Sequence, residues 1–519
     1  MTSGEHPGSG QQAAAVLPGT DVSPGERKPL ERKKSLAGFL LGPALFAVAL
    51  LLPPPEGVTE IGMRSLGVFL WVMAWWVAEP IPLPATAFLS LVLLILCGVF
   101  PLERAFGFWA HWVNLFLIGA CIIGQAMNIH GVNKRFAYWI MSLRVIGNSS
   151  WRLMLALLWA CALLSAIASN TVCTILFTSI ALSFIRNFNI PPRSRYSVAL
   201  LVCVPWAASI GGTATPVGAA GHLYSLGLLR EMNFHVGFFP WMMFGVPMML
   251  IAMAAMMLVI RLVFRPEFEK IQVSSSFARE ELRKLGPVRR GEKISVAVLL
   301  AALALWMLPD LVYFLVEPSH PAAQWVQNRL SWAVVALLAA MSLFLIPVNW
   351  KERRFAMTWD EAVKGIHWGV LAIVAGALAI GTALSSTEVG LGQLFVKGIG
   401  LLSEYGGTTT VLVAASIVFL GLLTNGVSNF ASMSIVIPIM LPLAAAPGSG
   451  LNPVALTLCL GLTASWAFAL PSATPLNAIA FSSGIVRTSD MFRGGIVLAV
   501  LCTLASILIA YPLLNWIFS

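Results

Sequence analysis

Two short polar motifs interrupt long apolar stretches of this chain. They read Ser169-Asn170-Thr171 and Ser428-Asn429-Phe430, and each lies in a long run without charged residues. Serine, threonine and asparagine cap helix ends and also offer oxygen and nitrogen atoms to a ligand. The two motifs therefore predict a binding site that uses hydroxyl and amide groups in place of charged side chains.

Each motif is followed, roughly 45 to 50 residues later, by a second apolar run that glycine, proline and threonine interrupt. The first break reads Gly211-Gly212-Thr213-Ala214-Thr215-Pro216-Val217-Gly218-Ala219-Ala220-Gly221, and the second reads Leu470-Pro471-Ser472-Ala473-Thr474-Pro475-Leu476-Asn477. An interrupted helix in a membrane must line a wet or ligand-filled cavity, because its freed backbone groups find no partner in lipid. A polar motif and a broken helix, repeated in two halves, are typical of a secondary transporter site near the bilayer midplane.

The charge that such a site binds follows from its helix ends. At the turn of a helical hairpin, one half-helix ends with free carbonyl groups and the next begins with free amide groups. The amides favour an anion, whereas carbonyls and hydroxyls suit a hard cation. A lone motif would favour a structural role, since serine and threonine bond to nearby carbonyls and asparagine links helices. The matched pair favours a site for a small anion beside cations.

The composition places the chain in a membrane. The 519 residues are 58% hydrophobic and 10% charged, the mean hydropathy is +0.85, and several runs can cross about 30 Å of hydrocarbon. The net charge of +10 lies mainly in short loops between apolar runs. This is the positive-inside pattern, which argues against a nucleic-acid partner. The sequence predicts a multi-pass protein of the cell (plasma or inner) membrane.

Enzyme chemistry finds little support in the sequence. No HExxH motif, no phosphate-binding glycine loop with lysine and no Cys/His pair at metal spacing is present. All seven cysteines lie in apolar segments, so we expect buried, inert thiols. His222, four residues after Gly218, is the one histidine at a predicted break. It either approaches the ligand, where it could supply positive charge, or packs within its helix.

The basic loops also indicate the direction in which each helix crosses the membrane. With these loops inside, the chain threads as about 11 transmembrane helices and two re-entrant hairpins, with the N-terminus cytoplasmic and the C-terminus outside. Each arm of the first hairpin has about 16 residues, or roughly 24 Å of helix, which reaches the middle of the membrane. The alternative, about thirteen plain helices, would place Arg186, Arg193 and Arg195 outside.

This threading divides the chain into six segments and gives its two halves opposite orientations, which is an inverted repeat. The predicted segments are a disordered cytoplasmic tail (1–35), N-terminal scaffold helices (36–106), a first repeat (107–264) with hairpin 152–187, a basic cytoplasmic loop (265–293), two helices with a cytoplasmic interfacial segment (294–366), and a second repeat (367–519) with hairpin 408–446. The predicted fold class is an all-α polytopic membrane protein.

The chain resembles the divalent anion:sodium symporter family, the carriers of dicarboxylates, citrate and sulfate. The resemblance extends from about Gly57 to the end of the chain. It rests on Glu79-Pro80-Ile81-Pro82-Leu83-Pro84, on Ser169-Asn170-Thr171, on Ser209-Ile210-Gly211-Gly212-Thr213-Ala214-Thr215, on Ser428-Asn429, and on Phe468-Ala469-Leu470-Pro471-Ser472-Ala473-Thr474-Pro475-Leu476-Asn477-Ala478-Ile479. The last string, followed by Arg487-Thr488-Ser489-Asp490, is the most specific.

The resemblance implies a homodimer in the lipid bilayer, each subunit having a scaffold domain and a transport domain that moves as an elevator. It implies two Na⁺ sites, the first formed by Ser165, Ser169, Asn170 and the carbonyl of Gly218, and the second by Thr424, Asn429 and the carbonyls of Val427 and Ala473. It also implies anion contacts at Asn170, Thr171, Ser428, Asn429, Thr474 and Pro475.

Two positions depart from the family pattern. Phe430 stands where the second motif usually ends in threonine, and Ala219 stands where the first break usually carries serine or threonine. Both positions belong to the predicted anion site, and both have lost a hydroxyl donor. A lost donor to a desolvated anion costs about 1.5–3 kcal/mol. We therefore expect sodium coupling to persist while the preference shifts away from the usual C4-dicarboxylates.

Two other functions remain open at the level of sequence. One is a sodium-independent anion exchanger in which His222 supplies the positive charge. The other is a receptor that has kept the fold, binds the anion and no longer transports it.

Overall fold

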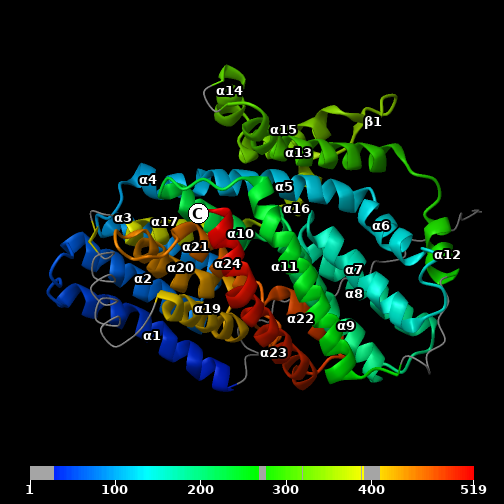
Figure 1. Ribbon diagram of the computed structural model, residues 1–519, viewed down its shortest axis with the longest axis horizontal. Coiled ribbons are helices and arrows are strands. Elements are labelled where there is room, and N and C mark those ends of the chain that lie inside the picture. The colour runs from blue at the N-terminus through cyan, green and yellow to red at the C-terminus, as the bar shows by residue number, and fades with distance from the viewer. Residues whose placement is uncertain (1–28, 268–275, 318–319, 387–388, 391–408) are drawn as a thin grey trace, which may run out of the picture.

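The computed structural model describes residues 29–267, 276–317, 320–386, 389–390 and 409–519. Helices make up most of this part (Figure 1). The first 28 residues of the predicted tail lie outside the described residues. Helix α1 begins at Pro29, inside the segment predicted as tail, because proline suits the first helical position and the following leucine, glutamate, arginine and lysines are good helix formers.

The described elements follow one another from the N-terminus to the end of the first repeat. They are α1 (Pro29–Leu51), α2 (Glu60–Ala78), α3 (Leu83–Leu96), α4 (Leu102–Gly107), η1 (Phe108–Ala110), α5 (Trp112–Ile129), α6 (Val132–Met141), α7 (Ser150–Ser165), α8 (Asn170–Asn187), α9 (Arg195–Gly212), η2 (Pro216–Gly218), α10 (Ala220–Glu231), α11 (Phe238–Val259) and the π-helix η3 (Ile260–Phe264).

The remaining described elements include the only short strands of this part of the chain. They are α12 (Ser276–Lys284), α13 (Arg290–Leu315), α14 (Pro321–Arg329), α15 (Trp332–Leu345), β1 (Pro347–Asn349), β2 (Arg354–Phe355), α16 (Trp359–Gly365), α17 (Trp368–Ser385), α19 (Thr409–Gly426), α20 (Asn429–Ala445), α21 (Pro453–Thr463), α22 (Pro475–Phe481), α23 (Thr488–Ala505), the π-helix η6 (Ser506–Ala510) and α24 (Tyr511–Ile517). Strands β1 and β2 pair antiparallel within the predicted interfacial segment.

Eight helical stretches of the described residues are long and apolar enough to cross a membrane, and several shorter apolar helices accompany them. The predicted all-α polytopic membrane fold is therefore confirmed. The apolar stretch of α9 is 94% buried, whereas that of α13 is only 28% buried. Helix α9 thus belongs to the centre of the protein, and α13 presents most of its apolar surface outward.

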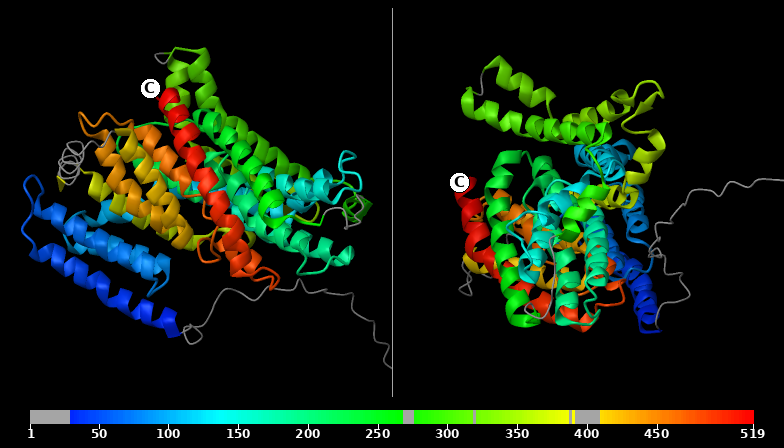
Figure 2. Two further views of the ribbon diagram at one scale, coloured as in Figure 1. Left: turned by 60° about the horizontal axis from the view of Figure 1, so that its bottom comes forward. Right: turned by 90° about the vertical axis from the view of Figure 1, so that its right-hand side faces the viewer.

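Helices α13, α14 and α15 form a layer along one side of the molecule (Figures 1 and 2). This layer packs on the rest of the chain mainly through α5, which contacts both α13 and α15. On another edge, α1 packs on α2, and α2 and α3 pack on α17. The helices that carry the polar motifs and the breaks form a third, central group around the buried helix α9.

Two helical hairpins and two broken helices make up that central group. Helices α7 and α8 pack on each other and on α9, and α19 and α20 pack on each other and on α21. Past its break, each broken helix crosses to the other hairpin: α10 packs on α20 and α21, while α22 packs on α8 and α9. Gly211 permits the close approach of α9 to α7, because a Cβ there would lie 2.0 Å from the carbonyl oxygen of Ala162.

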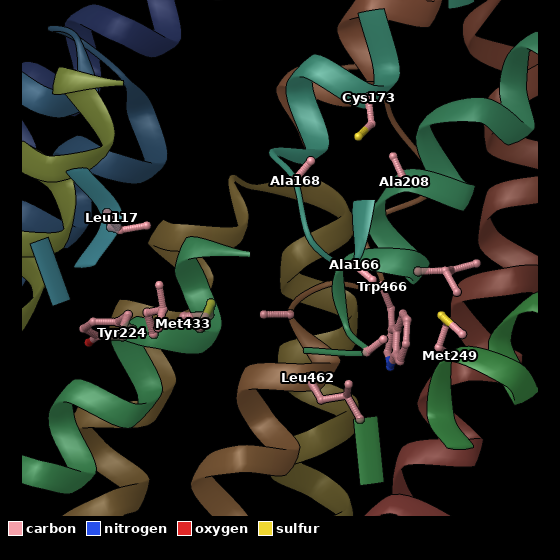
Figure 3. Close-up of a cluster of buried hydrophobic side chains, with 14 of the residues drawn as sticks. Leu117, Ala166, Ala168, Cys173, Ala208, Tyr224, Met249, Met433, Leu462 and Trp466 are labelled. Carbon is pink, nitrogen blue, oxygen red and sulfur yellow. The ribbon is translucent and has the colours of Figure 1, made fainter. Parts of the chain in front are cut away.

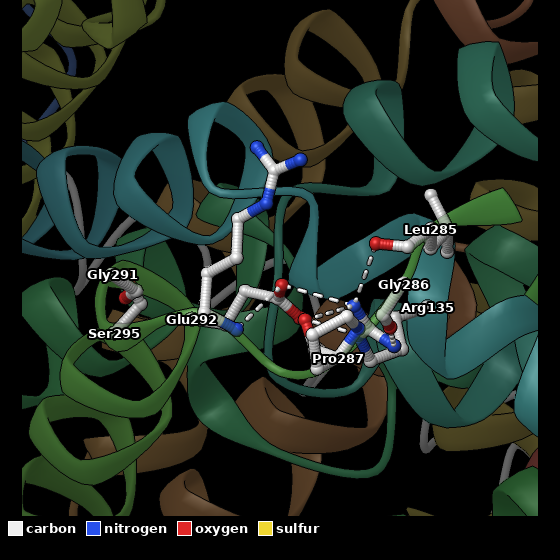
Figure 4. A network of polar contacts seen from close by, with 8 residues as sticks. Arg135, Leu285, Gly286, Pro287, Gly291, Glu292 and Ser295 are labelled. Atoms are coloured by element: carbon white, nitrogen blue, oxygen red, sulfur yellow. Dashed lines mark hydrogen bonds and ion pairs between the residues drawn. The ribbon is translucent and has the colours of Figure 1, made fainter. Parts of the chain in front are cut away.

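A buried ion pair ties α6 to the start of α13 (Figure 4). The guanidinium of Arg135 donates to both carboxylate oxygens of Glu292, whose side chain is 6% exposed. It also donates to the carbonyls of Leu285, Gly286 and Pro287, with a distance of 2.9 Å to Gly286. These bonds fix the end of the predicted basic loop against α6.

Candidate functional site

Both polar motifs lie at hairpin tips. Helix α8 begins at Asn170 with Ser169 as its N-cap, and α20 begins at Asn429 with Ser428 as its N-cap. The two caps have similar backbone angles, φ −60° and ψ 125° at Ser169 and φ −48° and ψ 137° at Ser428. Neither serine makes a side-chain capping hydrogen bond. The first amides of both helices therefore remain available to an anion.

A hydroxyl group orients the asparagine at each tip. Ser165 Oγ donates to Asn170 Oδ1 at 2.5 Å, and Thr424 Oγ1 lies 3.0 Å from Asn429 Oδ1. The spacing is five residues in both hairpins. Each tip thus presents a hydroxyl and an amide oxygen close together, which is a donor set that suits a hard cation such as Na⁺.

The first break brings a third oxygen to the Asn170 tip. A Cβ on Gly212 would lie 2.7 Å from the side-chain amide atoms of Asn170 and 3.0 Å from the carbonyl oxygen of Gly218. The Asn170 amide and the Gly218 carbonyl therefore meet at the end of α9, where only glycine leaves room for them. Thr215 Oγ1 donates to the carbonyl of Ala166 and holds the break against the hairpin.

Asparagine side chains hold the second break open. Asn425 donates to the carbonyls of Gly421 and Trp466 and accepts from the amides of Phe468 and Ala469, all between 2.8 and 2.9 Å. Asn477 donates to the carbonyls of Ala467 and Leu470 at 3.0 and 2.9 Å. These bonds satisfy the backbone groups that unwinding releases, and they let Thr474 cap α22.

The tips and breaks enclose a cavity of about 310 Å³. All eight predicted anion-binding residues line it: Asn170, Thr171, Ala219, Ser428, Asn429, Phe430, Thr474 and Pro475. Of the predicted sodium ligands, Ser169, Gly218 and Ala473 also line it, and Ser165 and Thr424 contact the two asparagines. No described contact places the carbonyl of Val427, which precedes Ser428 at the second tip.

Helices outside the hairpins form the opposite wall. Leu117 of α5 lines the cavity on this side, and Figure 3 shows it in one apolar cluster with Tyr224 and with Met433 of the second hairpin. Leu83, Val370, Leu371 and Ile373 complete this largely apolar side. None of the described lining residues is lysine, arginine, aspartate or glutamate. An anion here must therefore be held by amides, hydroxyls and co-bound cations.

His222 lies behind the cavity wall and does not line it. The side chain is fully buried, its ring centroid is 4.8 Å from that of Trp241, and Nε2 lies 3.1 Å from Ser465 Oγ. Ser465 itself lines the cavity. Of the two roles left open for His222, this position fits packing within its helix.

Four polar residues of the wall were not predicted from the sequence to be site residues: Ser209, Ser465, Cys121 and His367. Ser209 Oγ donates to the carbonyl of Ser465 and so joins the two broken helices. Cys121 also corrects the expectation that all seven cysteines are buried, because it and Cys97 are partly exposed. A thiol inside an apolar run gives no sequence signal that separates a cavity wall from a packed interior.

Comparison with known proteins identifies the family to which a chain of this architecture belongs. A family model described as the transmembrane region of sodium:sulfate symporters matches residues 33–519. The chain belongs to this family. The family is one of transporters, so the predicted resemblance and the prediction that the protein is not an enzyme are both confirmed.

Curated relatives of this symporter-family chain include two sodium-dependent dicarboxylate transporters named SdcS. The one from Staphylococcus saprophyticus is 28% identical over 487 residues, which cover 92% of this chain and 91% of the relative. The one from Staphylococcus aureus strain USA300 is 28% identical over 488 residues, with 92% and 90% covered.

Two solved structures share the fold. The YdaH transporter of Alcanivorax borkumensis superposes with a TM-score of 0.55 at 15% identity, covering 94% of this chain and 98% of that one. MtrF of Neisseria gonorrhoeae gives a TM-score of 0.53 at 12% identity, covering 93% and 96%. At these identities the likeness concerns the fold alone.

Proposed function

We propose that this symporter-family member couples the movement of Na⁺ to the uptake of a small organic or inorganic anion. The observation that carries this proposal is the pair of hairpin tips, each with an asparagine oriented by a hydroxyl five residues earlier, at one cavity without lysine or arginine. Helix amides serve the anion and the oxygen clusters serve two sodium ions. The SdcS relatives are sodium-dependent transporters, which supports the same coupling.

The apolar part of the wall refines the substrate class. Val217, Ala219, Phe430 and Met433 give the hairpin side of the cavity an apolar flank. The charged end of the anion contacts Asn170, Thr171, Ser428 and Asn429, and its remainder packs on the flank. This arrangement favours a carboxylate-type anion with one charged end, or one of different shape, over a C4-dicarboxylate.

Transport by an elevator movement within a homodimer is part of this proposal. The hairpins and broken helices move as one body against α5, α17 and the α13–α15 layer. The cytoplasmic N-terminus and the external C-terminus follow from the same threading. Exchange without sodium has less support, because His222 lies behind the wall and does not add its charge to the cavity.

Reconstituted vesicles test the coupling directly. Protein in vesicles with an inward sodium gradient and no internal anion should accumulate labelled anion, while sodium-free vesicles preloaded with anion should not exchange it. The opposite result would establish an exchanger. Saturable binding without flux in either condition would establish a receptor.

A thermal-shift screen identifies the anion. Di- and tricarboxylates, monocarboxylates, sulfate and sulfonates are compared with and without sodium, because a ligand that binds only the folded state raises the unfolding temperature. We expect the largest shift from an anion with one charged end, and only when sodium is present. A larger shift with succinate than with any such anion would contradict the proposed specificity.

A further inference from the structure

Three exposed tryptophans lie close together in the chain, between α15 and the start of α17. Trp350, Trp359 and Trp368 are 69%, 67% and 49% exposed. Helix α17 is long and apolar enough to cross a membrane, and α15 is a shorter apolar helix. The segment that joins them therefore belongs at a membrane surface. Tryptophan is enriched at that level, because its ring is apolar and its N–H group needs a polar partner.

Strands β1 and β2 of this segment form a short hairpin, residues 347–355, which we call the basic hairpin. It carries Lys351, Arg353 and Arg354, and all three residues are exposed. The φ angle of Arg353 is 49°, a left-handed conformation that glycine adopts without strain. The hairpin thus keeps a long cationic side chain at a position where the backbone favours glycine.

The charges of the basic hairpin are not balanced within the protein. Among the described residues, no ion pair joins its three cations to a carboxylate. Its one acidic residue is Glu352, which is also exposed. Other cations at the surface do have partners: Arg193 lies 2.8 Å from Asp490, and Lys284 lies 2.7 Å from Glu281. The basic hairpin therefore offers its positive charge to an anion from outside the chain.

The basic hairpin is fixed to the body of the protein. It contacts α13 and α15 and projects from one end of their layer (Figure 1). Ala356 and Met357, directly after it, are 1% and 2% exposed. His130 at the end of α5 donates from Nε2 to the carbonyl of Ala356 at 2.8 Å, and the amide of Ala356 donates to the carbonyl of Ile346 at 3.1 Å. The cations and tryptophans thus stand on a well-packed support.

We propose that the basic hairpin, with Trp350 and Trp359 beside it, binds the headgroup of an anionic phospholipid. The lipid phosphate pairs with the two arginines and the lysine, since a guanidinium donates two parallel hydrogen bonds to a phosphate. The tryptophan rings lie against the glycerol region and the upper acyl chains. Our threading places this end of the protein in the cytoplasmic leaflet, whose anionic lipids attract clustered lysine and arginine. The inference concerns the membrane and does not depend on which ion or anion is transported.

Lipid binding is measured on purified, delipidated full-length protein in detergent. Phosphatidylglycerol is titrated while the unfolding temperature is followed, because a ligand that binds only the folded state raises it. Phosphatidylcholine with the same acyl chains provides the neutral comparison. Glycerol 3-phosphate, which is soluble, separates binding of a lipid from binding of a free phosphate.

The two variants remove equal charge from two exposed surfaces. The test variant changes the cations of the basic hairpin (Lys351→Gln, Arg353→Gln and Arg354→Gln). The matched control changes three exposed cations of α12 (Arg279→Gln, Arg283→Gln and Lys284→Gln). Without lipid, the test variant should unfold at the temperature of the unmodified protein, because the altered side chains are exposed.

The phosphatidylglycerol concentration at half-maximal stabilisation should rise at least about tenfold in the test variant, since each cation near an anionic surface strengthens attraction about fivefold. It should stay unchanged in the control. Phosphatidylcholine and glycerol 3-phosphate should stabilise the unmodified protein less than phosphatidylglycerol does. An unchanged concentration in the test variant, or an equal rise in the control, would overturn the proposal. Equal stabilisation by phosphatidylcholine or by glycerol 3-phosphate would do the same.

Discussion

The asparagines at the two tips can serve both ions of a symporter. Ser165 and Thr424 occupy one side of each amide oxygen, so the oxygen and its hydroxyl partner face the same small volume. The amide nitrogen remains a donor for an anion. One residue at each tip therefore joins the cation to the anion, which is the physical basis of coupling that we propose.

The first prediction concerns the hydroxyls behind the asparagines. Ser165→Ala and Thr424→Ala each remove one oxygen of a proposed cation site and release the adjacent amide, so the sodium concentration for half-maximal uptake should rise roughly tenfold. Sodium titration of uptake measures this effect. Ser179→Ala is the matched control, because that exposed hydroxyl only bonds to the carbonyl of Ile175 in its own helix. An unchanged sodium dependence in both test variants would remove these residues from the cation sites.

The second prediction concerns the two lost donors. Phe430→Thr and Ala219→Thr each return a hydroxyl to the cavity wall, and a hydrogen bond to a charged group contributes about 1.5–3 kcal/mol. Affinity for succinate should therefore rise about ten- to hundredfold in each single variant, and further in the double variant. Competition by succinate for uptake provides the measurement. Met433→Leu, which keeps the wall apolar, should leave succinate affinity unchanged.

The third prediction concerns the buried histidine. His222→Gln keeps a side chain that can bond to Ser465 but removes any ionisable group. Sodium-driven uptake should keep its sodium dependence in this variant, because His222 does not line the cavity. Loss of anion binding or of uptake in a variant with an intact fold would show that the imidazole charge takes part.

At the scale of elements, the two breaks are built differently. The second is held by the side chains of Asn425 and Asn477, while the first relies on Thr215 and on close backbone packing at Gly212 and Gly218. His222 and Asn477 both stand three residues after the N-cap of the helix that resumes, at Ala219 and Thr474. Asn477 bonds within its own break, whereas His222 bonds to the break of the other repeat.

The fourth prediction follows from Asn425. Asn425→Ala leaves two backbone amides and two carbonyls without the partners they have now, and each such group costs about 1–3 kcal/mol when it stays buried. The variant should unfold several degrees lower in detergent, even where anion and sodium are saturating. Asn187→Ala is the control, since the exposed amide bonds only to Ser183 one turn away. Equal unfolding temperatures would mean that other contacts hold the second break.

At the scale of the whole molecule, the Arg135–Glu292 pair links α6 to the outward-facing α13. Removing one partner of a buried ion pair costs about 3–5 kcal/mol, because the other charge stays buried alone. Replacing both with apolar residues of similar size is far less costly.

The fifth prediction uses this difference. Arg135→Met should lower the unfolding temperature more than the double change Arg135→Met with Glu292→Met. A double-mutant cycle on thermal unfolding measures the coupling. If the single and double variants unfold alike, the pair contributes no specific link between α6 and α13.

Much of this architecture can be predicted from the sequence because it depends on local patterns. Apolar runs, basic loops and the prolines of each break predict membrane helices and their interruptions within short windows. The Ser-Asn motifs stand at the hairpin tips because a polar residue that can cap a helix fits few other places in an apolar run. Composition alone did not predict that α1 begins at Pro29, within the segment expected to be a tail.

Only the tertiary structure brings distant segments together. The sequence shows that Asn425 is a polar residue within an apolar run. Its hydrogen bonds to Trp466, Phe468 and Ala469 form because α19 packs beside the second break. The contact of Cys121 with His367 joins residues 246 positions apart, and His222 lies behind the wall because α10 turns its imidazole toward Trp241. Local preference fixes where helices begin and break, whereas side-chain neighbours across the cavity depend on packing among helices that no short window contains.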